Sequence, residues 1–480
     1  MSAPVLLAVV AAYFALLLAV AWRTSRRADN DSFFIGNRSS HWGLVAFGMI
    51  GTSLSGVTFI SVPGSVGAGA FSYFQIMLGQ LAGYAVVAFV LLPLYYRLRL
   101  RSIYRYLGTR LGLAAHRTGA GFFILSRTLG ATARLYLVVR ILQDLVLAQF
   151  DMPFWLSACL VLAMILLYTL EGGVKTIVWT DTLQTTGMLG GLVICVVFLL
   201  HALGLDLAGG WQAMRAAGLA EVFVTDPMSA SHWAKQLLAG AAIAIAMTGL
   251  DQEMMQKNIS VRRLADARKN MMVMAMLMTA VVLLFLFLGG LLTIYARQQG
   301  LAAQGDRLFP AVVMDHLPAW VQLIFVVALI SALFPSADGA ITALTSSTCI
   351  DLIGLQERHW DEARQRRVRQ AVHLGYAALF LLLTLGFRWL DDPSMVTLIL
   401  KLAGYTYGPL LGLFAFGILT TRTLRPGVLP GVALAAPALC WIVDTHQAAL
   451  FGGYRMGLEL LLVNAALTFA GLWAGRRVSH

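Results

Sequence analysis

Long apolar stretches separated by short polar segments dominate this chain. Thirteen of them are long enough to cross the ~30 Å hydrocarbon core of a bilayer as helices. Their approximate limits are 4–22, 42–63, 71–96, 119–149, 153–169, 175–202, 235–256, 271–296, 317–353, 370–388, 394–420, 427–445 and 455–475. The longest connection, 203–234, is too short to hold a soluble domain. The pattern predicts an all-α polytopic membrane protein that forms a single transmembrane domain over residues 1–480.

The composition agrees with this fold class. Hydrophobic residues make up 59% of the chain and charged residues 12%, whereas about a quarter of an average soluble domain is charged. The net charge of +12 would favour a nucleic-acid partner only if the basic residues formed one soluble face, and they are spread over many loops. The four cysteines lie in apolar stretches without metal-ligand spacing, which is typical of packing residues. We therefore expect a lipid bilayer as partner, no nucleic acid and no obligate protein partner.

The distribution of basic residues predicts the orientation, because cytoplasmic loops carry an excess of Lys and Arg. One set of alternate loops, with the C-terminal tail, holds most of the 35 Lys and Arg residues, and segment 257–269, which begins at Lys257, is part of it. The opposite loops hold only Arg215, Lys235, Arg297, Arg307, Arg388 and Arg455. We predict an inner-membrane protein with its N-terminus outside and its C-terminus in the cytoplasm. No positively charged segment precedes the first stretch, so we expect that stretch to be retained rather than cleaved as a signal peptide.

The second stretch contains residues 51–64, GTSLSGVTFISVPG, which are unusually polar for a span. Its glycines and Pro63 loosen a helix, and unwound backbone is tolerated in the membrane only where it meets protein, water or a ligand. Ser55 and Thr58, three residues apart, would offer their hydroxyls on one side. The segment favours a discontinuous helix at a midplane binding site. The alternative is a kinked helix whose hydroxyls bond back to its own carbonyls.

Stretches two to six and seven to eleven form two sets of five, over residues 42–202 and 235–420, that start on opposite sides of the membrane. The glycines that interrupt the first helix of each set are Gly51 and Gly56, and Gly240 and Gly249. This pattern predicts an inverted repeat with its site at the interface. Residues 4–22 would then form one extra helix before the core, and 427–475 two extra helices after it.

Asp181 is an ionisable residue inside the sixth stretch, about a turn and a half from Lys175. A carboxylate at this depth is costly unless it is partnered or functional. It suits a hard cation, which takes oxygen ligands. The alternative is an ion pair with a basic residue near the cytoplasmic mouth.

The ninth stretch reads SALFPSADG from Ser331. Pro335 has no N–H to donate to the carbonyl four residues back, so the Ser331 carbonyl is freed within the membrane. Ser336 and Asp338 lie within the same turn. Carbonyl, hydroxyl and carboxylate oxygens together indicate a cation site. The alternative is a proline kink that neighbouring hydroxyls repair.

Arg134, near the middle of the fourth stretch, has no acidic residue within four positions along the chain. A guanidinium at that depth needs an anion, and its fork matches a carboxylate. We favour a substrate carboxylate over a carboxylate from a distant part of the protein. Asp251, near the cytoplasmic end of the seventh stretch, is expected to cap or gate rather than bind.

With these residues in view, the chain resembles the sodium:solute symporter family, whose members include proline, sugar, pantothenate and sialic-acid transporters. The resemblance covers nearly the whole chain, and its most specific part runs from Gly172-Gly173-Val174 through Asp181 to Gln184. The other matching motifs are Ser55-Gly56 with Pro63-Gly64, Asp251-Gln252 with Gln256-Lys257, and Gly404-Tyr405-Thr406-Tyr407-Gly408-Pro409. The resemblance implies a LeuT-type core of two inverted five-helix repeats with discontinuous helices, and a transporter rather than an enzyme.

The resemblance also implies a sodium site between the first and eighth core helices. It assigns to that site the backbone carbonyls of Gly51, Leu54 and Ala332 and the hydroxyl positions occupied by Pro335 and Ser336. The first hydroxyl position is normally Ser, so Pro335 departs from the pattern. Either the Ser331 carbonyl or Asp338 compensates, or the site is weaker, or the coupling ion differs. Asp181 matches the position that helps to bind a second sodium ion in some members, so one or two sodium ions are expected.

For the solute, the sialic-acid members use Ser and Thr on the first core helix and an Arg on the third to hold a carboxylate. The comparable positions here are Ser55, Thr58 and Arg134. Residues 240–247, GAAIAIAM, lack the amide and aromatic residues that sugar carriers place there, and Gln75 or Gln80 would supply one amide contact. The resemblance implies a sodium-coupled symporter that takes up a small organic anion, such as a sialic or other sugar acid, by alternating access.

Other functions remain open at this point. A proton-coupled symporter is the nearest, given Pro335, Asp181 and Asp338, and a sodium-coupled carrier of a neutral sugar or amino acid is another. A transporter-like sensor would carry a signalling domain, and we expect none in a chain that ends at His480. A membrane enzyme would show a cluster of His, Asp, Glu or Cys near one interface, whereas the nine histidines are scattered singly.

Overall fold

The computed structural model describes residues 3–25, 40–145, 147–355, 357–389, 395–425, 427–452 and 454–476. These residues form helices joined by loops, and the extended pairings among them are two isolated β-bridges. The predicted all-α class is confirmed.

The α-helices, in chain order, are α1 (Ala3–Ser25), α3 (Trp42–Ser53), α4 (Gly56–Gly69), α5 (Tyr73–Val86), α6 (Leu92–Arg97), α7 (Arg105–Leu111), α8 (Leu113–Leu145), α9 (Phe154–Ala202), α10 (Leu207–Ala216), α11 (Trp233–Ala244), α12 (Gln252–Ile259), α13 (Leu264–Gln298), α14 (Leu308–Ala311), α15 (Ala319–Ser347), α16 (Glu362–Phe387), α17 (Met395–Leu419), α18 (Val428–Thr445), α19 (Gln447–Phe451) and α20 (Leu460–Ala474). The π-helical segments are η2 (Val87–Leu91), η4 (Ile245–Gly249), η6 (Val312–His316) and η7 (Thr348–Leu352), and the 3-10 segments are η3 (Leu147–Phe150) and η5 (Gly305–Arg307).

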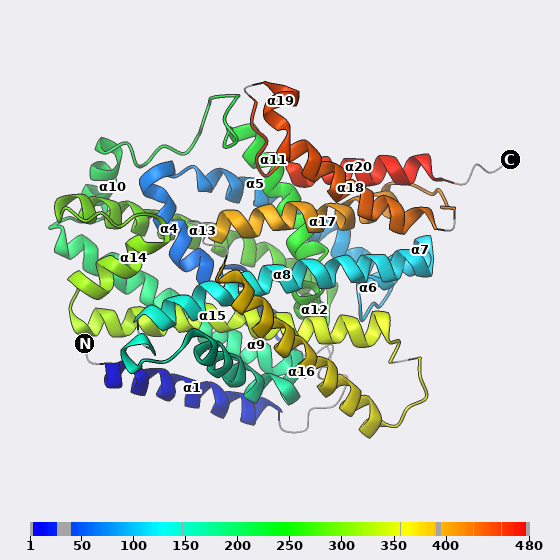
Figure 1. Cartoon of the computed structure of the whole chain (residues 1–480), viewed down its shortest axis with the longest axis horizontal. Coiled ribbons are helices and arrows are strands. Elements are labelled where there is room, and N and C mark those ends of the chain that lie inside the picture. Colours follow the sequence, from blue (N-terminus) through cyan, green and yellow to red (C-terminus); the bar gives the residue numbers. More distant parts are fainter. Residues whose placement is uncertain are drawn as a thin grey trace.

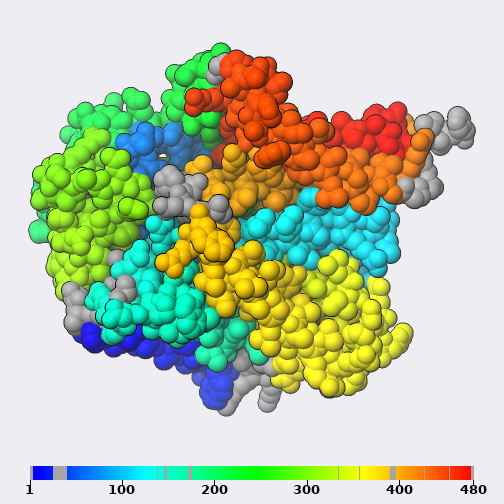
Figure 2. Space-filling model, in the orientation of Figure 1, coloured from blue at the N-terminus to red at the C-terminus, as the bar shows by residue number. Residues whose placement is uncertain are grey.

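The first and last helices lie at the periphery. α1 runs along one edge of the molecule and α18 to α20 along the opposite edge (Figure 1). Figure 2 shows the same arrangement on the surface, blue at one edge and orange to red at the other. α1 packs on α9 and α15, and α18 on α17 and α20.

Nine helices in the described ranges are long and apolar enough to cross a membrane, or up to eleven if each of two bent helix pairs forms one span. Two shorter apolar segments, Phe154–Leu170 and Leu460–Ala474, cover two further predicted stretches. Every predicted stretch therefore contains a helix, which makes the protein multi-pass. The count of thirteen complete spans stays a prediction.

α9 differs from the prediction. We expected two spans, 153–169 and 175–202, with a connection between them, but the structure has one unbroken helix from Phe154 to Ala202. The connection contains no proline, and its two glycines cost only about 1 kcal/mol each in a helix. Local composition there permits a helix as readily as a loop. The side chain of Lys175 lies outside the described residues.

The two bent pairs are the first helices of the two predicted sets. α3 and α4 are bent by 59°, and α11 with η4 is bent against α12 by 64°. The first break falls at Leu54, where the backbone leaves the helical region (φ −93°, ψ 52°), while Pro63 is accommodated inside α4. The second falls at Leu250, and Asp251 caps α12 by accepting hydrogen bonds from two backbone N–H groups of its first turn. The predicted discontinuous helices are present.

Carbonyl groups that the second break releases find partners on neighbouring helices. Tyr95 OH donates to Gly249 O and Tyr104 OH donates to Leu250 O, both at 2.9 Å. An unpaired carbonyl within hydrocarbon costs several kcal/mol. These two bonds therefore stabilise the broken conformation.

Glycines bring the broken helices close to their neighbours. α11 packs along α5, where a Cβ at Gly240 would lie 2.2 Å from Ile76 O. α3 packs on α9, where a Cβ at Gly51 would lie 2.4 Å from Thr185 Oγ1. A larger residue at Gly240 would push α11 and α5 apart because it meets backbone, whereas one at Gly51 would require the Thr185 side chain to move.

Candidate functional site

Both bent helices contribute to the wall of one cavity, which the first break at Leu54 lines directly. Its walls come from α3, α4, α5, α8, α11, η4, α12, α13 and α17, so both predicted sets of five helices contribute. The polar residues of the lining are Thr52, Ser53, Ser55, Thr58, Tyr73, Gln80, Tyr84, Arg127, Arg134 and Thr248. A mostly apolar cavity with a few convergent polar groups is the usual form of a small-molecule site.

Ser55 and Thr58 lie at the first break, where both are buried and line the cavity. Ser55 stands at the N-cap position of α4 without a side-chain capping bond. Within the described part of the chain, neither hydroxyl has a hydrogen-bond partner. The alternative of hydroxyls that bond back to their own helix holds for Thr52, whose Oγ1 donates to Gly48 O at 3.4 Å, but not for Ser55 or Thr58.

Arg127 and Arg134 both line the cavity from α8, but only one of them is neutralised. Arg127 forms an ion pair with Glu253, and its Nη1 lies 3.8 Å from Asp251 Oδ2. Arg134 has no ion pair or hydrogen bond to any described residue. The alternative prediction for Arg134 was an ion pair with a carboxylate from a distant part of the protein. No described residue forms that ion pair.

The two glutamines of α5 lie in different surroundings. Gln80 lines the cavity, and its buried Oε1 has no hydrogen-bond partner among the described residues. Gln75 is instead engaged by backbone. Its Nε2 donates to Ser72 O at 3.0 Å and to Ser231 O at 3.3 Å, and its Oε1 accepts from Val224 N at 3.2 Å. The structure places only Gln80 among the cavity residues.

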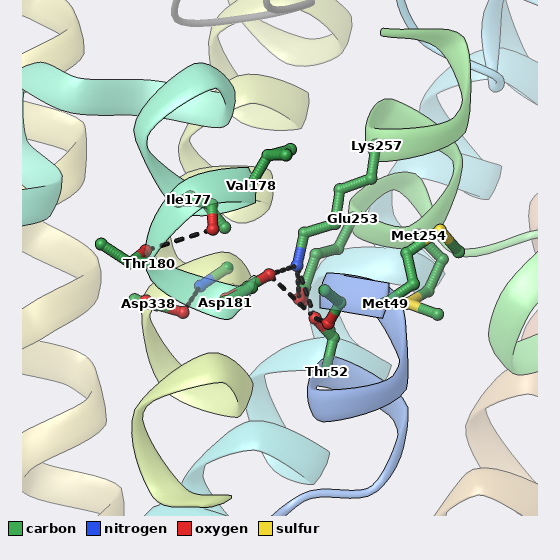
Figure 3. A network of polar contacts seen from close by, with 12 residues as sticks. Met49, Thr52, Ile177, Val178, Thr180, Asp181, Glu253, Met254, Lys257 and Asp338 are labelled. Carbon is green, nitrogen blue, oxygen red and sulfur yellow. Dashed lines mark hydrogen bonds and ion pairs between the residues drawn. The ribbon is translucent and has the colours of Figure 1, made fainter. Parts of the chain in front are cut away.

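A second polar cluster surrounds Asp181 of α9 (Figure 3). Asp181 is fully buried, and its Oδ2 accepts hydrogen bonds from Lys257 Nζ of α12 at 2.7 Å and from Thr52 Oγ1 of α3 at 3.1 Å. The ammonium also donates to Thr52 Oγ1 at 2.7 Å and lies 3.4 Å from Glu253 Oε1. The alternative for Asp181, an ion pair with a basic residue, is what the structure shows.

The position of Lys257 corrects the predicted loop 257–269. The sequence prediction counted Lys257 among cytoplasmic loop residues, but it belongs to α12 and is only 2% exposed. The reason is electrostatic, since the buried carboxylates of Asp181 and Glu253 require a countercharge. The four-residue spacing of Glu253 and Lys257 on one helix face is the sequence signal that indicates this pairing.

Asp338 of α15 is fully buried and lies in the same part of the molecule as Asp181 (Figure 3). Its Oδ2 accepts a hydrogen bond from Tyr168 OH at 2.9 Å, and its Oδ1 accepts one from Gly339 N at 2.5 Å. No described basic residue forms an ion pair with Asp338. α15 continues through Pro335 as one helix.

The residues of the predicted sodium site lie on or next to α3 and on α15, and these two helices contact each other. α3 ends at Ser53, so carbonyls in its last turn, including that of Gly51, lack helical partners. Leu54 follows directly, and Ala332 and Ser336 are buried on α15, which contacts α3 and α4. Carbonyl, hydroxyl and carboxylate oxygens suit sodium better than a transition metal. No group of three or more His, Cys, Asp or Glu among the described residues could hold such a metal.

Two broken helices with a cavity between them, lined by apolar and a few polar residues, are the arrangement of a secondary transporter of the membrane. Residues 33–434 match the Sodium:solute symporter family, and the chain belongs to this family. The resemblance seen in the sequence is confirmed, and the protein is a membrane transporter rather than an enzyme.

Similar proteins include the Sodium/sialic acid symporter NanT of Aliivibrio fischeri, which is 21% identical over 472 residues, covering 95% of this chain and 91% of that protein. The human Sodium/iodide cotransporter is 24% identical over 452 residues, covering 89% of this chain and 68% of that protein. A solved structure of the substrate-bound, outward-open state of a Na+-coupled sialic acid symporter has a TM-score of 0.83 at 18% identity, covering 97% of this chain and 96% of that chain. That similarity confirms the fold.

Proposed function

We propose that this protein couples inward sodium flux to the uptake of a small organic anion, such as a sialic or other sugar acid, by alternating access. The observation that carries the proposal is Arg134, which lines the central cavity without an ion pair to any described residue. Arg134 is partly buried, and a cation in a cavity that is partly shielded from water attracts an anion more strongly than it would in bulk water. The planar guanidinium fork favours a carboxylate, which it binds through two parallel hydrogen bonds.

Other cavity groups support an oxygen-rich solute. The hydroxyls of Ser55 and Thr58 and the Oε1 of Gln80 have no hydrogen-bond partner among the described residues. Each would bond a hydroxyl or amide of a solute held at Arg134. The two relatives named above carry sialic acid and iodide, and both solutes are anions.

For the ion, we propose a sodium site where α3 ends against α15. Its ligands would be the backbone carbonyls of Gly51, Leu54 and Ala332 and the hydroxyl of Ser336, with Asp181 and Asp338 supplying negative charge for the same ion or a second one. Sodium would then stabilise the outward-open arrangement, and the solute would permit closure. Coupling requires this differential affinity of each ligand for the two arrangements.

The proposed architecture follows the basic-residue distribution and the two bent helices. Residues 42–202 and 235–420 would form the inverted five-helix repeats, with the N-terminus outside and the C-terminus in the cytoplasm of an inner membrane. An epitope at each terminus, probed with antibody in intact cells and in permeabilised cells, tests this orientation. A C-terminal epitope that is accessible in intact cells would contradict it.

The first test is uptake of labelled sialic acid by the full chain in proteoliposomes, under an inward sodium gradient and a matched potassium gradient. Accumulation with sodium alone supports the proposal. Arg134→Ala should abolish it, while the exposed-residue control Arg215→Ala should not. If sialic acid is not accumulated, other sugar acids and monocarboxylates follow in the same vesicles. Sodium-driven uptake of a neutral solute that is unaffected by Arg134→Ala would contradict the anion proposal.

A proton-coupled carrier is the second candidate, because Asp338 places a buried carboxylate without an ion pair to any described residue. The same vesicles separate the two candidates. An inward proton gradient without sodium would drive uptake only in the proton-coupled case.

A further inference from the structure

The ammonium of Lys257 is surrounded as a bound metal cation would be. Its three N–H donors face three oxygen atoms, Thr52 Oγ1 at 2.7 Å, Asp181 Oδ2 at 2.7 Å and Glu253 Oε1 at 3.4 Å. These oxygens belong to α3, α9 and α12, and the Lys257 side chain is almost fully buried among them (Figure 3). An all-oxygen cage is also the environment that a hard cation prefers.

The second oxygen of the Asp181 carboxylate does not take part in binding the ammonium. Asp181 Oδ1 has no hydrogen-bond partner among the described residues, and the same holds for Gln184 Oε1 and Thr185 Oγ1. Residues three and four positions apart on a helix share one face, so these atoms lie on one side of α9. Thr185 Oγ1 also faces the end of α3 at Gly51. One oxygen of Asp181 thus holds the ammonium, and the same face of α9 carries buried oxygens that lack a hydrogen-bond partner in the described part of the chain.

More carboxylates than basic side chains take part in the ion pairs around this point. The buried carboxylates in these pairs are Asp181, Glu253 and Asp251, and their buried basic partners are Lys257 and Arg127. A monovalent cation would reduce the excess, but a cation at Asp181 would also repel the ammonium.

We propose that Lys257 is a built-in cation that competes with sodium for Asp181. This inference rests on the sodium coupling proposed above and assigns its control to a side chain of the protein. Without sodium, the ammonium neutralises Asp181 and ties α12 to α3 through Thr52. A sodium ion at Asp181 Oδ1, Gln184 and Thr185 weakens that tie. Lys257 therefore lowers the sodium affinity. It also links ion binding to the contact between α3 and α12, which are one half of each broken helix.

The test is a sodium titration of the purified full chain without solute, with choline added to keep the ionic strength constant. Sodium binding is measured by the change in melting temperature and in tryptophan fluorescence. Lys257→Met keeps the aliphatic stem and removes the charge. Its sodium concentration at half-saturation is expected to fall by about tenfold or more, because a competing positive charge is gone. Lys257→Arg keeps the charge and should remain within about threefold of the wild type. Adding Asp181→Asn to Lys257→Met should remove the gain in sodium affinity.

If the sodium concentration at half-saturation is unchanged or higher in Lys257→Met, the inference is overturned. Loss of an ion pair that is purely structural would not tighten sodium binding. If Lys257→Met does not fold, Thr52→Val replaces it, since this change removes one acceptor of the ammonium. Its half-saturation should fall by roughly threefold, and no change or a rise overturns the inference. A wild-type chain that does not respond to sodium overturns the sodium coupling as well. A wild type that responds, with no tightening in the variants, overturns only the role of Lys257.

Discussion

Arg127 and Arg134 both line the central cavity from α8, yet carboxylates of the described chain neutralise only Arg127. Seven residues on a helix return a side chain to nearly the same face, about two turns away. The two side chains nevertheless have different roles. Arg127 ties α8 to α12 through Glu253, while Arg134 lines the cavity without an ion pair to any described residue.

Arg134→Met is expected to abolish uptake of the anionic solute and the thermal stabilisation that the solute confers. The reason is that the carboxylate loses its bidentate partner. Stabilisation by sodium should persist, because no predicted sodium ligand is changed. Thermal unfolding with solute and with sodium, titrated separately, checks both halves. Undiminished stabilisation by the solute would show that its negative charge is bound elsewhere.

Arg127→Met is expected to destabilise the fold by about 3–5 kcal/mol, because Glu253 would remain buried without its ion-pair partner. Arg134→Met is the matched control on the same helix face and should have little effect on stability. Thermal unfolding in detergent measures both. Adding Glu253→Gln to Arg127→Met should recover part of the loss. Equal stabilities for Arg127→Met and the wild type would contradict the prediction.

Asp181→Asn is expected to raise the sodium concentration needed for half-maximal transport, since it removes a buried negative charge beside the proposed ion site. The size of the change should be about tenfold or more if Asp181 binds the ion directly. Asp315→Asn, at an exposed acidic residue, is the control and should leave the sodium dependence unaltered. Identical sodium dependence in both variants would remove Asp181 from the ion path.

Gly240→Ala is expected to destabilise the packing of α11 on α5. The added Cβ would lie 2.2 Å from Ile76 O, and a backbone atom cannot rotate away, so a cost of about 1–3 kcal/mol is expected. Gly190→Ala is the control, because its Cβ would meet nothing within 4 Å. It should be neutral or stabilising by up to about 1 kcal/mol. The melting temperatures of the two variants and the wild type are compared. Similar melting temperatures for Gly240→Ala and Gly190→Ala would contradict this prediction.

The fold class and most helix limits could be predicted from the sequence because they depend on local composition. Apolar length sets a membrane span, and clustered glycine and hydroxyl residues mark the interruption at Leu54. The connection between 169 and 175 was predicted wrongly for a local reason as well. Its glycines tolerate either a loop or a helix, so the sequence there does not choose between them, and the structure continues α9 through it.

The sequence alone determined which buried groups require a partner, because a polar or charged side chain within an apolar span is costly wherever it lies. Asp181 and Arg134 stood out on that ground. The tertiary structure decided which of them received a partner. Lys257 lies 76 positions from Asp181, and no periodicity along the chain encodes a contact between α9 and α12. Composition sets the cost of burying a charge, whereas only helix packing sets the distance to the charge that neutralises it.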